Sequence, residues 1–301
     1  MNSSNKYPAF EDTGVIKKRT KILIVVAIAL TLVWAICLSS IFIYTMINGD
    51  FSFDRGTDVD NDTEKKPVKT YTTDDYNYAE VLSDAAKNAI NQTSEDYLLL
   101  INKTYPVGAN FTVSSLKKLD TKYTSGGKTV ELEINAALAA EALMAEMRAC
   151  GFDKITITSG YRSYSYQKTL FDKYFAEEKA KNPGLSDEKI KEIVLGYSAE
   201  PGYSEHHSGL VIDFITSGMN DLINYGSETP NNSGDRGFAE TEEYKWLLEN
   251  AHKFGFILRY PENKVNETKY NYESWHFRFV GVDAATKIHN NNITLEKYLK
   301  K

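Results

Sequence analysis

The 301-residue sequence predicts an α+β fold, a single domain of about 200 residues preceded by one transmembrane helix. Three observations support this prediction. A run of 26 residues near the N-terminus carries no charge, helical and strand-like patterns alternate after about residue 97, and no glycine-rich phosphate loop joins them. The composition, 42% hydrophobic and 25% charged, is ordinary for a chain with a globular part.

The uncharged run spans residues 22–47. A helix needs roughly 20 apolar residues to cross the hydrocarbon core of a bilayer, so this run is long enough to span it with some tilt. A buried core helix rarely stays uncharged over this length. The apolar part of a cleaved signal peptide is shorter, about 7–15 residues, and ends in a small-residue cleavage site. No clear site of that kind follows Ile47, which favours an uncleaved anchor.

Charges on the two sides of the run predict its orientation. Four basic residues precede it between Lys17 and Lys21, whereas the first charge after it is Asp50. Because basic flanks stay on the cytoplasmic side, we expect residues 1–21 to form a cytoplasmic tail and everything after residue 47 to lie outside the cell. The expected location is therefore the cell membrane, crossed once.

The charge balance and the cysteines exclude two classes of protein. The net charge of −6 argues against a nucleic-acid partner, which needs a basic face. Cys37 lies in the apolar run and Cys150 is alone in the rest of the chain, so neither an intrachain disulfide nor a cysteine-ligated zinc finger is expected.

Residues 48–95 are polar and show no sustained helix or strand period. We interpret them as an extracellular linker, interrupted by a weak helix around residues 78–90. The folded domain is expected over residues 96–301.

Apolar periodicity and helix-stop residues define the elements of the domain. A helix over 135–150 begins at Asn135, a capping residue, and is followed by Gly151. A strand with alternating β-branched residues follows over 154–158. The further elements expected, in chain order, are a helix over 165–181, a short helix near 190–194, a strand over 210–215, a helix over 241–254 and a strand over 275–280.

Two blocks of sequence combine histidines with carboxylates. One of the adjacent His206 and His207 precedes Asp213 on a predicted strand, and His276 lies on another. Two neutral imidazoles and one carboxylate, with a coordination position left open, form the ligand set of a catalytic zinc. Strand alternation places Asp213 opposite the apolar face of its strand and His276 opposite the aromatic face of its own.

Glu273 lies three residues before His276, where a carboxylate beside the metal can take a proton from water. A histidine near an aspartate is most often only a hydrogen-bonded pair. The zinc-site hypothesis therefore rests on the histidines and carboxylates of both blocks taken together. The alternatives are weak: no H-E-x-x-H or G-x-S-x-G motif is present, and Cys150 has no evident partner. Arg162, in the turn after the 154–158 strand, can donate to a carboxylate or oxyanion, and Gln167 adds an amide donor.

These blocks closely resemble the VanY-type D-alanyl-D-alanine carboxypeptidases, zinc peptidases of bacterial cell walls. The matching segments are SGYRSYSYQ (159–167), PGYSEHHSGLVID (201–213) and ESWHFRFVG (273–281), and GFILRYPENK (255–264) also looks like the family. The resemblance covers roughly residues 97–290. It implies a small, mainly antiparallel sheet flanked by helices, as in the Hedgehog and D,D-peptidase fold.

The resemblance also implies roles for individual residues and a Zn²⁺ cofactor. His206, Asp213 and His276 match the zinc ligands, and His207 falls at a variable position. Glu273 matches the general base. The remaining assignments are Arg162 for transition-state stabilisation and Gln167, Ser204, Ser159 and Tyr161 for substrate binding. Val211, Phe279 and Ser274 depart from the usual family residues, and none of these changes removes a ligand or the base.

The implied activity is removal of the C-terminal D-alanine from peptidoglycan stem peptides by a membrane-anchored enzyme. Similar enzymes act as L,D-carboxypeptidases or peptidoglycan endopeptidases, so these remain alternatives. A more distant alternative is a non-catalytic module that binds the cell wall, for which a damaged metal site would be expected.

Overall fold

The computed structural model describes residues 69–216 and 237–301, which belong to one compact unit spanning Pro67–Lys301. The predicted cytoplasmic tail, the transmembrane segment 22–47 and the first part of the linker lie outside the described residues. Within the described ranges, no helix is both long enough and apolar enough to cross a membrane.

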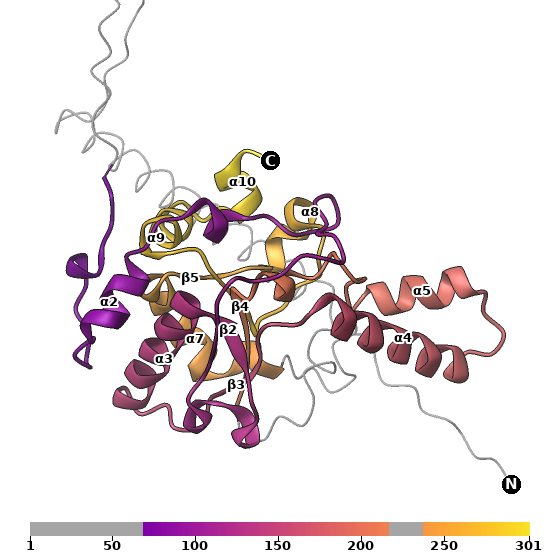
Figure 1. The fold of residues 1–301 in the computed structure, drawn as a ribbon, viewed down its shortest axis with the longest axis horizontal. Helices are drawn as coiled ribbons and strands as arrows, with labels where there is room; N and C mark the ends of the chain where they lie inside the picture. The colour runs from indigo at the N-terminus through magenta and orange to yellow at the C-terminus, as the bar shows by residue number, and fades with distance from the viewer. Residues whose placement is uncertain (1–68, 217–236) are drawn as a thin grey trace, which may run out of the picture. The chain divides into compact units, whose positions relative to one another are not determined.

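A four-stranded antiparallel sheet lies at the centre of this unit (Figure 1). Its order is β3-β4-β6-β5, and a separate hairpin pairs β1 with β2. The strands are β1 (Leu116–Lys118), β2 (Glu131–Glu133), β3 (Thr156–Ser159), β4 (Val211–Ile215), β5 (Phe256–Leu258) and β6 (His276–Phe279). The α+β class and the antiparallel sheet expected from the sequence are confirmed.

The helices follow the predicted order with shifted ends. They are α2 (Asp84–Ile90), α3 (Ile134–Ala149), α4 (Tyr164–Lys181), α5 (Asp187–Leu195), α7 (Glu242–Asn250), α8 (Val265–Thr268), α9 (Val282–Asn291) and α10 (Leu295–Leu299). The helix expected over 241–254 ends at Asn250 and continues as a 3₁₀ turn to Phe254, which Gly255 ends with a φ of 80°. A left-handed residue of this kind is the usual C-terminal stop of a helix.

Alternation along the strands separates an apolar face from a polar one. Ile212 on β4 lies directly opposite Phe277 on β6, and both are essentially fully buried. Together with Phe214 they pack in the main core with Leu143 of α3 and residues of α7. The opposite face of the same strands carries Asp213 and His276, so the core fixes the position of the candidate site.

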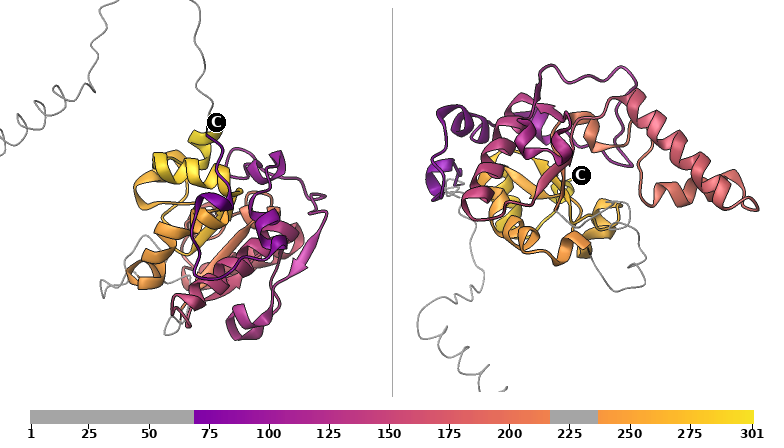
Figure 2. Two further views of the ribbon diagram at one scale, coloured as in Figure 1. Left: turned by 90° about the vertical axis from the view of Figure 1, so that its left-hand side faces the viewer. Right: turned by 90° about the horizontal axis from the view of Figure 1, so that it is seen from below.

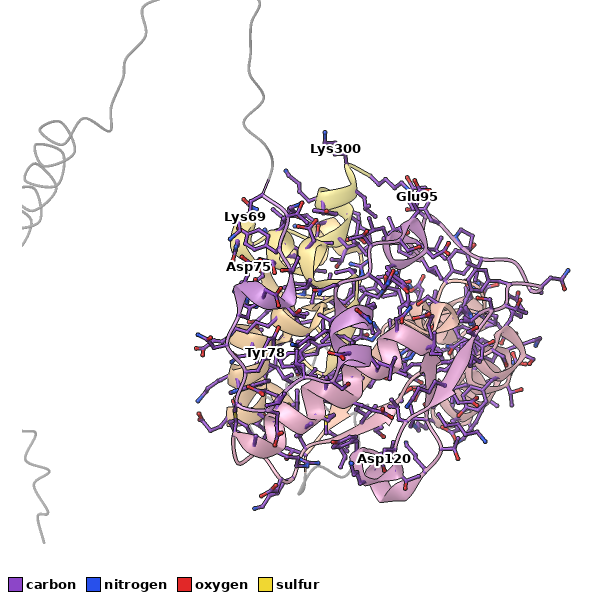
Figure 3. All side chains as sticks on the ribbon, turned by 60° about the vertical axis from the view of Figure 1, so that its left-hand side comes forward. Lys69, Asp75, Tyr78, Glu95, Asp120 and Lys300 are labelled. Carbon is purple, nitrogen blue, oxygen red and sulfur yellow. The ribbon has the colours of Figure 1, made fainter. Side chains whose placement is uncertain are left out.

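The segment before residue 96 contributes to this core. Ala86, Ala89 and Ile90 of α2 are buried, and α2 packs on α3. The carboxylate of Glu146 on α3 accepts hydrogen bonds from the backbone N–H groups of Ala79 and Glu80, at 2.8 Å each. Figure 3 labels Lys69, Asp75 and Tyr78 along this segment. The folded unit therefore begins earlier than the expected boundary at residue 96.

Helices α4 and α5 form a hairpin that extends away from the sheet (Figures 1 and 2). Only Gln167 and Phe171 of α4 are buried. Gln167 lies in the first turn of α4, next to the loop that carries Arg162. The hairpin is thus attached to the sheet beside the polar face of β4 and β6.

Candidate metal centre

His206, Asp213 and His276 form a buried cluster of potential metal ligands. One donor atom from each lies within 4.8 Å of the other two. Each residue is no more than 4% exposed. Among the described residues, this is the one group of three or more His, Cys, Asp or Glu side chains with metal-binding geometry. The choice that the sequence left open between His206 and His207 therefore falls on His206.

Strand register brings two of the ligands together. Asp213 on β4 is paired directly with His276 on β6, and Asp213 Oδ1 lies 3.2 Å from His276 Nδ1. Directly opposite residues of an antiparallel pair share one face, at Cβ separations of about 5 Å. The spacing between two strands therefore sets the spacing between these two donors.

His206 reaches the cluster from a short 3₁₀ turn, Glu205–Ser208, that precedes β4. Gly209 ends this turn with a φ of 69°, a conformation that favours glycine. A Cβ atom at Gly209 would lie 3.0 Å from the backbone nitrogen of Glu133. The reversal lets His206 Nε2 lie 3.2 Å from Asp213 Oδ2.

Neighbouring polar groups orient both imidazoles. His206 Nδ1 lies 2.7 Å from the carbonyl oxygen of Gly160, so Nδ1 carries the proton and Nε2 is free to bind a metal. His276 turns the other way. Its Nε2 faces Glu205 Oε2 at 3.6 Å, which directs Nδ1 toward Asp213. In both residues a fixed neighbour selects the nitrogen that faces the cluster.

Glu205 is a supporting residue to which the sequence analysis assigned no role. Its Oε1 accepts hydrogen bonds from Arg259 Nε at 2.8 Å and from Arg278 Nη1 at 3.0 Å. Arg259 also forms a bidentate pair with Glu296, at 2.6 and 2.9 Å. Burial alone would raise the pKa of Glu205, but the two guanidinium groups hold it well below its usual range. The carboxylate beside His276 is therefore ionised.

The chemistry of the three donors fits zinc. Burial lowers the pKa of His206 to about 4, assisted by the Arg162 guanidinium, so its imidazole is neutral near pH 7, as a ligand must be. Burial would also lower the pKa of His276, but the carboxylates of Asp213, Glu205 and Glu273 raise it to about 9, so His276 releases a proton when a metal binds. The same negative field favours a metal cation. Asp213 Oδ1, buried and without a hydrogen-bond partner, is available to coordinate it.

Glu273 lies beside the cluster without belonging to the three-ligand set. Its Oε2 is 3.3 Å from His276 Nδ1, and its side chain is 21% exposed, against about 5% for the ligands. Burial raises the pKa of Glu273 to about 7. A carboxylate that can take and return a proton near neutral pH, open to solvent on one side, suits general base catalysis.

Arg162 lies on the other side of Asp213. Its Nη2 is 3.1 Å from Asp213 Oδ2, and both Nε and Nη2 donate to the hydroxyl of Ser159, at 3.1 and 2.8 Å. The structure thus places Ser159 as a support for the guanidinium. The side chain of Arg162 remains 23% exposed and can meet a ligand.

The other predicted substrate residues lie in the segments that carry Arg162 and His206. Gln167 is buried, donates to the carbonyl of Ala199 at 2.7 Å, and keeps its Oε1 without a partner. Ser204 is buried immediately before the turn that carries His206. Tyr161 is half-buried, and its backbone N–H donates to the carbonyl of Glu131 at 2.7 Å. Their contact with substrate stays a prediction.

His207 has a structural role. Its Nδ1 lies 2.7 Å from the carbonyl oxygen of Arg162, and its Nε2 accepts a hydrogen bond from the Gly202 N–H at 3.0 Å. Its ring stacks on Tyr164. Both ring nitrogens are occupied, so His207 connects the loop of Arg162 to the turn of His206.

Comparison with known proteins decides the family. The model of the VanY D-alanyl-D-alanine carboxypeptidase family matches residues 129–282, which include all three sequence motifs. The chain belongs to the VanY family. The resemblance inferred from the motifs is confirmed, and the chain is an enzyme of the peptide-hydrolysing class.

Two curated bacterial proteins are similar to this chain over most of its length. YodJ of Bacillus subtilis, named a carboxypeptidase, is 35% identical over 85% of this chain and 90% of its own length. A D-alanyl-D-alanine carboxypeptidase of Enterococcus faecalis is 34% identical over 67% of this chain and 65% of its own.

Solved structures of VanY proteins share the fold. VanYB in complex with D-alanine-D-alanine is 34% identical, covers 68% of this chain and 98% of its own, and gives a TM-score of 0.53. A mutant of the D,D-pentapeptidase VanY from a VanB-type resistance cassette has been solved with Zn(II). It gives a TM-score of 0.52 at 34% identity and covers 68% of this chain and 99% of its own. The structure of the L,D-carboxypeptidase LdcB gives a TM-score of 0.56 at 31% identity. It covers 70% of this chain and 98% of its own.

Proposed function

We propose that this protein is a membrane-anchored, zinc-dependent D-alanyl-D-alanine carboxypeptidase that removes the C-terminal D-alanine from peptidoglycan stem peptides. The observation that carries the proposal is the buried cluster of His206, Asp213 and His276, flanked by Glu273 and Arg162. The relatives support the substrate. One is named a D-alanyl-D-alanine carboxypeptidase, and VanYB has been solved with D-alanine-D-alanine.

Zn²⁺ is the cofactor that suits this donor set, and a VanY relative has been solved with it. When bound, it lowers the pKa of a water molecule toward roughly 7 and polarises the peptide carbonyl. His206 Nε2, Asp213 and His276 Nδ1 would hold the metal, while Gly160 and Glu205 keep the two imidazoles in the orientation that ligation requires.

Glu273 and Arg162 supply the remaining chemistry. Glu273 takes the proton from the attacking water and returns it to the departing D-alanine amine, which its pKa of about 7 in the described structure suits. Arg162, anchored by Ser159 and Asp213, donates to the oxyanion that develops on the scissile carbonyl. Its anchoring means that the guanidinium is oriented before substrate arrives.

The membrane location belongs to the same proposal. The uncharged segment 22–47 would anchor the protein, with the tail in the cytoplasm and the catalytic unit outside the cell. A polymeric cell-wall substrate suits an anchored enzyme. Peptidoglycan and the membrane are thus the expected partners, and the acidic chain gives no reason to expect nucleic acid.

L,D-carboxypeptidase activity on tetrapeptides is the second candidate, because LdcB shares the fold with a TM-score of 0.56. Mass analysis of defined muropeptides separates the two. The zinc-loaded full chain in detergent is incubated with pentapeptide and with tetrapeptide substrates. Loss of one D-alanine from the pentapeptide alone supports the proposal, and cleavage of the tetrapeptide alone favours the alternative. A protein that cleaves neither, with or without zinc, contradicts both.

A further inference from the structure

Lys128 is a basic residue bonded to β3 that none of the three sequence motifs contains. It follows a tight turn, Ser125–Gly127, between β1 and β2. Gly126 and Gly127 both have positive φ in this turn, at 62° and 67°. Thr124, which precedes the turn, forms an isolated parallel bridge with Ile157 of β3 and donates its hydroxyl to the carbonyl of Lys128 at 2.7 Å. The backbone of Lys128 is therefore fixed beside β3.

The ammonium group of Lys128 contacts β3 one residue before Ser159. Nζ donates to the hydroxyl of Thr158 at 2.8 Å. The next residue, Ser159, is paired with Asp213 across the sheet and accepts the two hydrogen bonds from Arg162. Partial burial lowers the pKa of Lys128 and the Arg162 guanidinium lowers it further, whereas Asp213 raises it. The hydrogen bond to Thr158 therefore holds the ammonium beside Ser159, the residue that supports Arg162.

Lys128 also differs from the other lysines nearby. Lys117 pairs with Glu141 at 2.5 Å, and Lys122 pairs with Asp120 at 3.1 Å. Within residues 69–216 and 237–301, Lys128 has no carboxylate at ion-pair distance. Thr158 occupies one of its three N–H donors, and the residue is exposed to solvent. An anion that enters the site can therefore meet an ammonium that is already in position.

We infer that Lys128 binds the terminal carboxylate of the peptide substrate and so makes the enzyme select chain ends. This inference rests on the proposed carboxypeptidase function. In such a substrate the carboxylate lies one residue beyond the scissile carbonyl, a distance of roughly 4 Å between Cα atoms. Glu273 repels an incoming carboxylate, and Arg162 already pairs with Asp213. Lys128 supplies the positive charge that the substrate needs there.

The test compares a pentapeptide ending in D-alanyl-D-alanine as the free acid with the same peptide as its C-terminal amide. Lys128→Met removes the charge and keeps most of the apolar part of the side chain. Lys122→Met makes the same change in the same loop and is the matched control. For the free acid, Lys128→Met is expected to raise KM about 10- to 100-fold with kcat nearly unchanged, since a charge-assisted hydrogen bond is lost. Lys128→Arg should restore most of the loss.

The amide and a binding measurement complete the test. Lys128→Met should leave the KM for the amide unchanged, because the amide carries no charge. An equal rise for acid and amide, or no rise for the acid, overturns the inference while the proposed function stands. If the wild type cleaves neither peptide, the proposed function fails. In that case the inference on Lys128 is tested by calorimetry, which measures binding of the free acid to zinc-loaded Glu273→Gln protein. At least tenfold weaker binding with Lys128→Met supports the inference, and equal binding overturns it.

Discussion

Replacing Glu205 with glutamine tests whether a buried ion network positions the metal ligand His276. In the native structure two buried carboxylates, Glu205 and Glu296, balance two buried guanidinium groups, those of Arg259 and Arg278. The variant leaves Glu296 alone to balance both. Breaking a buried pair by removing one partner costs about 3–5 kcal/mol of unfolding free energy. The neutral amide also no longer directs His276 Nε2, so zinc affinity should fall roughly 10- to 100-fold.

Urea unfolding and zinc competition with a chromophoric chelator measure the two effects. Glu192→Gln is the matched control, because Glu192 pairs with Lys189 at 2.6 Å on an exposed helix surface. Surface pairs of this kind contribute little, so the control should match the wild type in both assays. If Glu205→Gln also matched the wild type in both, the network would have no part in positioning His276, and the reasoning above would be refuted.

Three further predictions concern single residues. Glu273→Gln should retain zinc, measured by elemental analysis, and lose about 10²- to 10⁴-fold in kcat, because the base is gone; unchanged turnover would refute the assignment. Gly209→Ala should reduce both the melting temperature and zinc affinity, because a Cβ there is strained at a φ of 69° and meets Glu133; a melting temperature equal to that of the wild type would contradict it. Burial, assisted by the stacked His289, lowers the pKa of His252 to about 3. The unfolded state then binds more protons between about pH 3 and 6.5, so stability should rise with pH over that range by up to ~1.4 kcal/mol per unit, and His252→Phe should flatten the slope.

The sequence predicted the strands and helices that carry strong local patterns. The strands at 154–158, 210–215 and 275–280 appear within two residues of their expected ends, because alternation and β-branched residues are local signals. The strand β5, Phe256–Leu258, was not expected as an element. Its three residues are too few to show a period, and it forms only because β6 pairs with it.

The start of the folded unit could not be read from the sequence. Residues 73–90 are rich in polar and small side chains, and they resemble a linker in composition. Their attachment depends on distant groups: Tyr76 bonds to Thr286, and Glu146 accepts two backbone N–H groups of the segment. Contacts between residues that far apart in the chain leave no local pattern.

In the site, too, roles that depend on residues distant in the sequence could not be predicted. The motifs identified the three ligands, Glu273 and Arg162, because their spacing and residue types are specific. Glu205 sits inside a motif, yet its role depends on Arg259 and Arg278, more than 50 residues away. Lys128 lies outside all three motifs, and only the fold brings it to Thr158.

The zinc content of the purified full-length chain tests the central claim most directly. Elemental analysis after dialysis against zinc-free buffer should give close to one zinc per wild-type chain, and close to none for Asp213→Ala, because Asp213 Oδ1 and Oδ2 face the two imidazoles at 3.2 Å each. Equal zinc in the two proteins, or none in the wild type, would contradict a metal centre built from His206, Asp213 and His276.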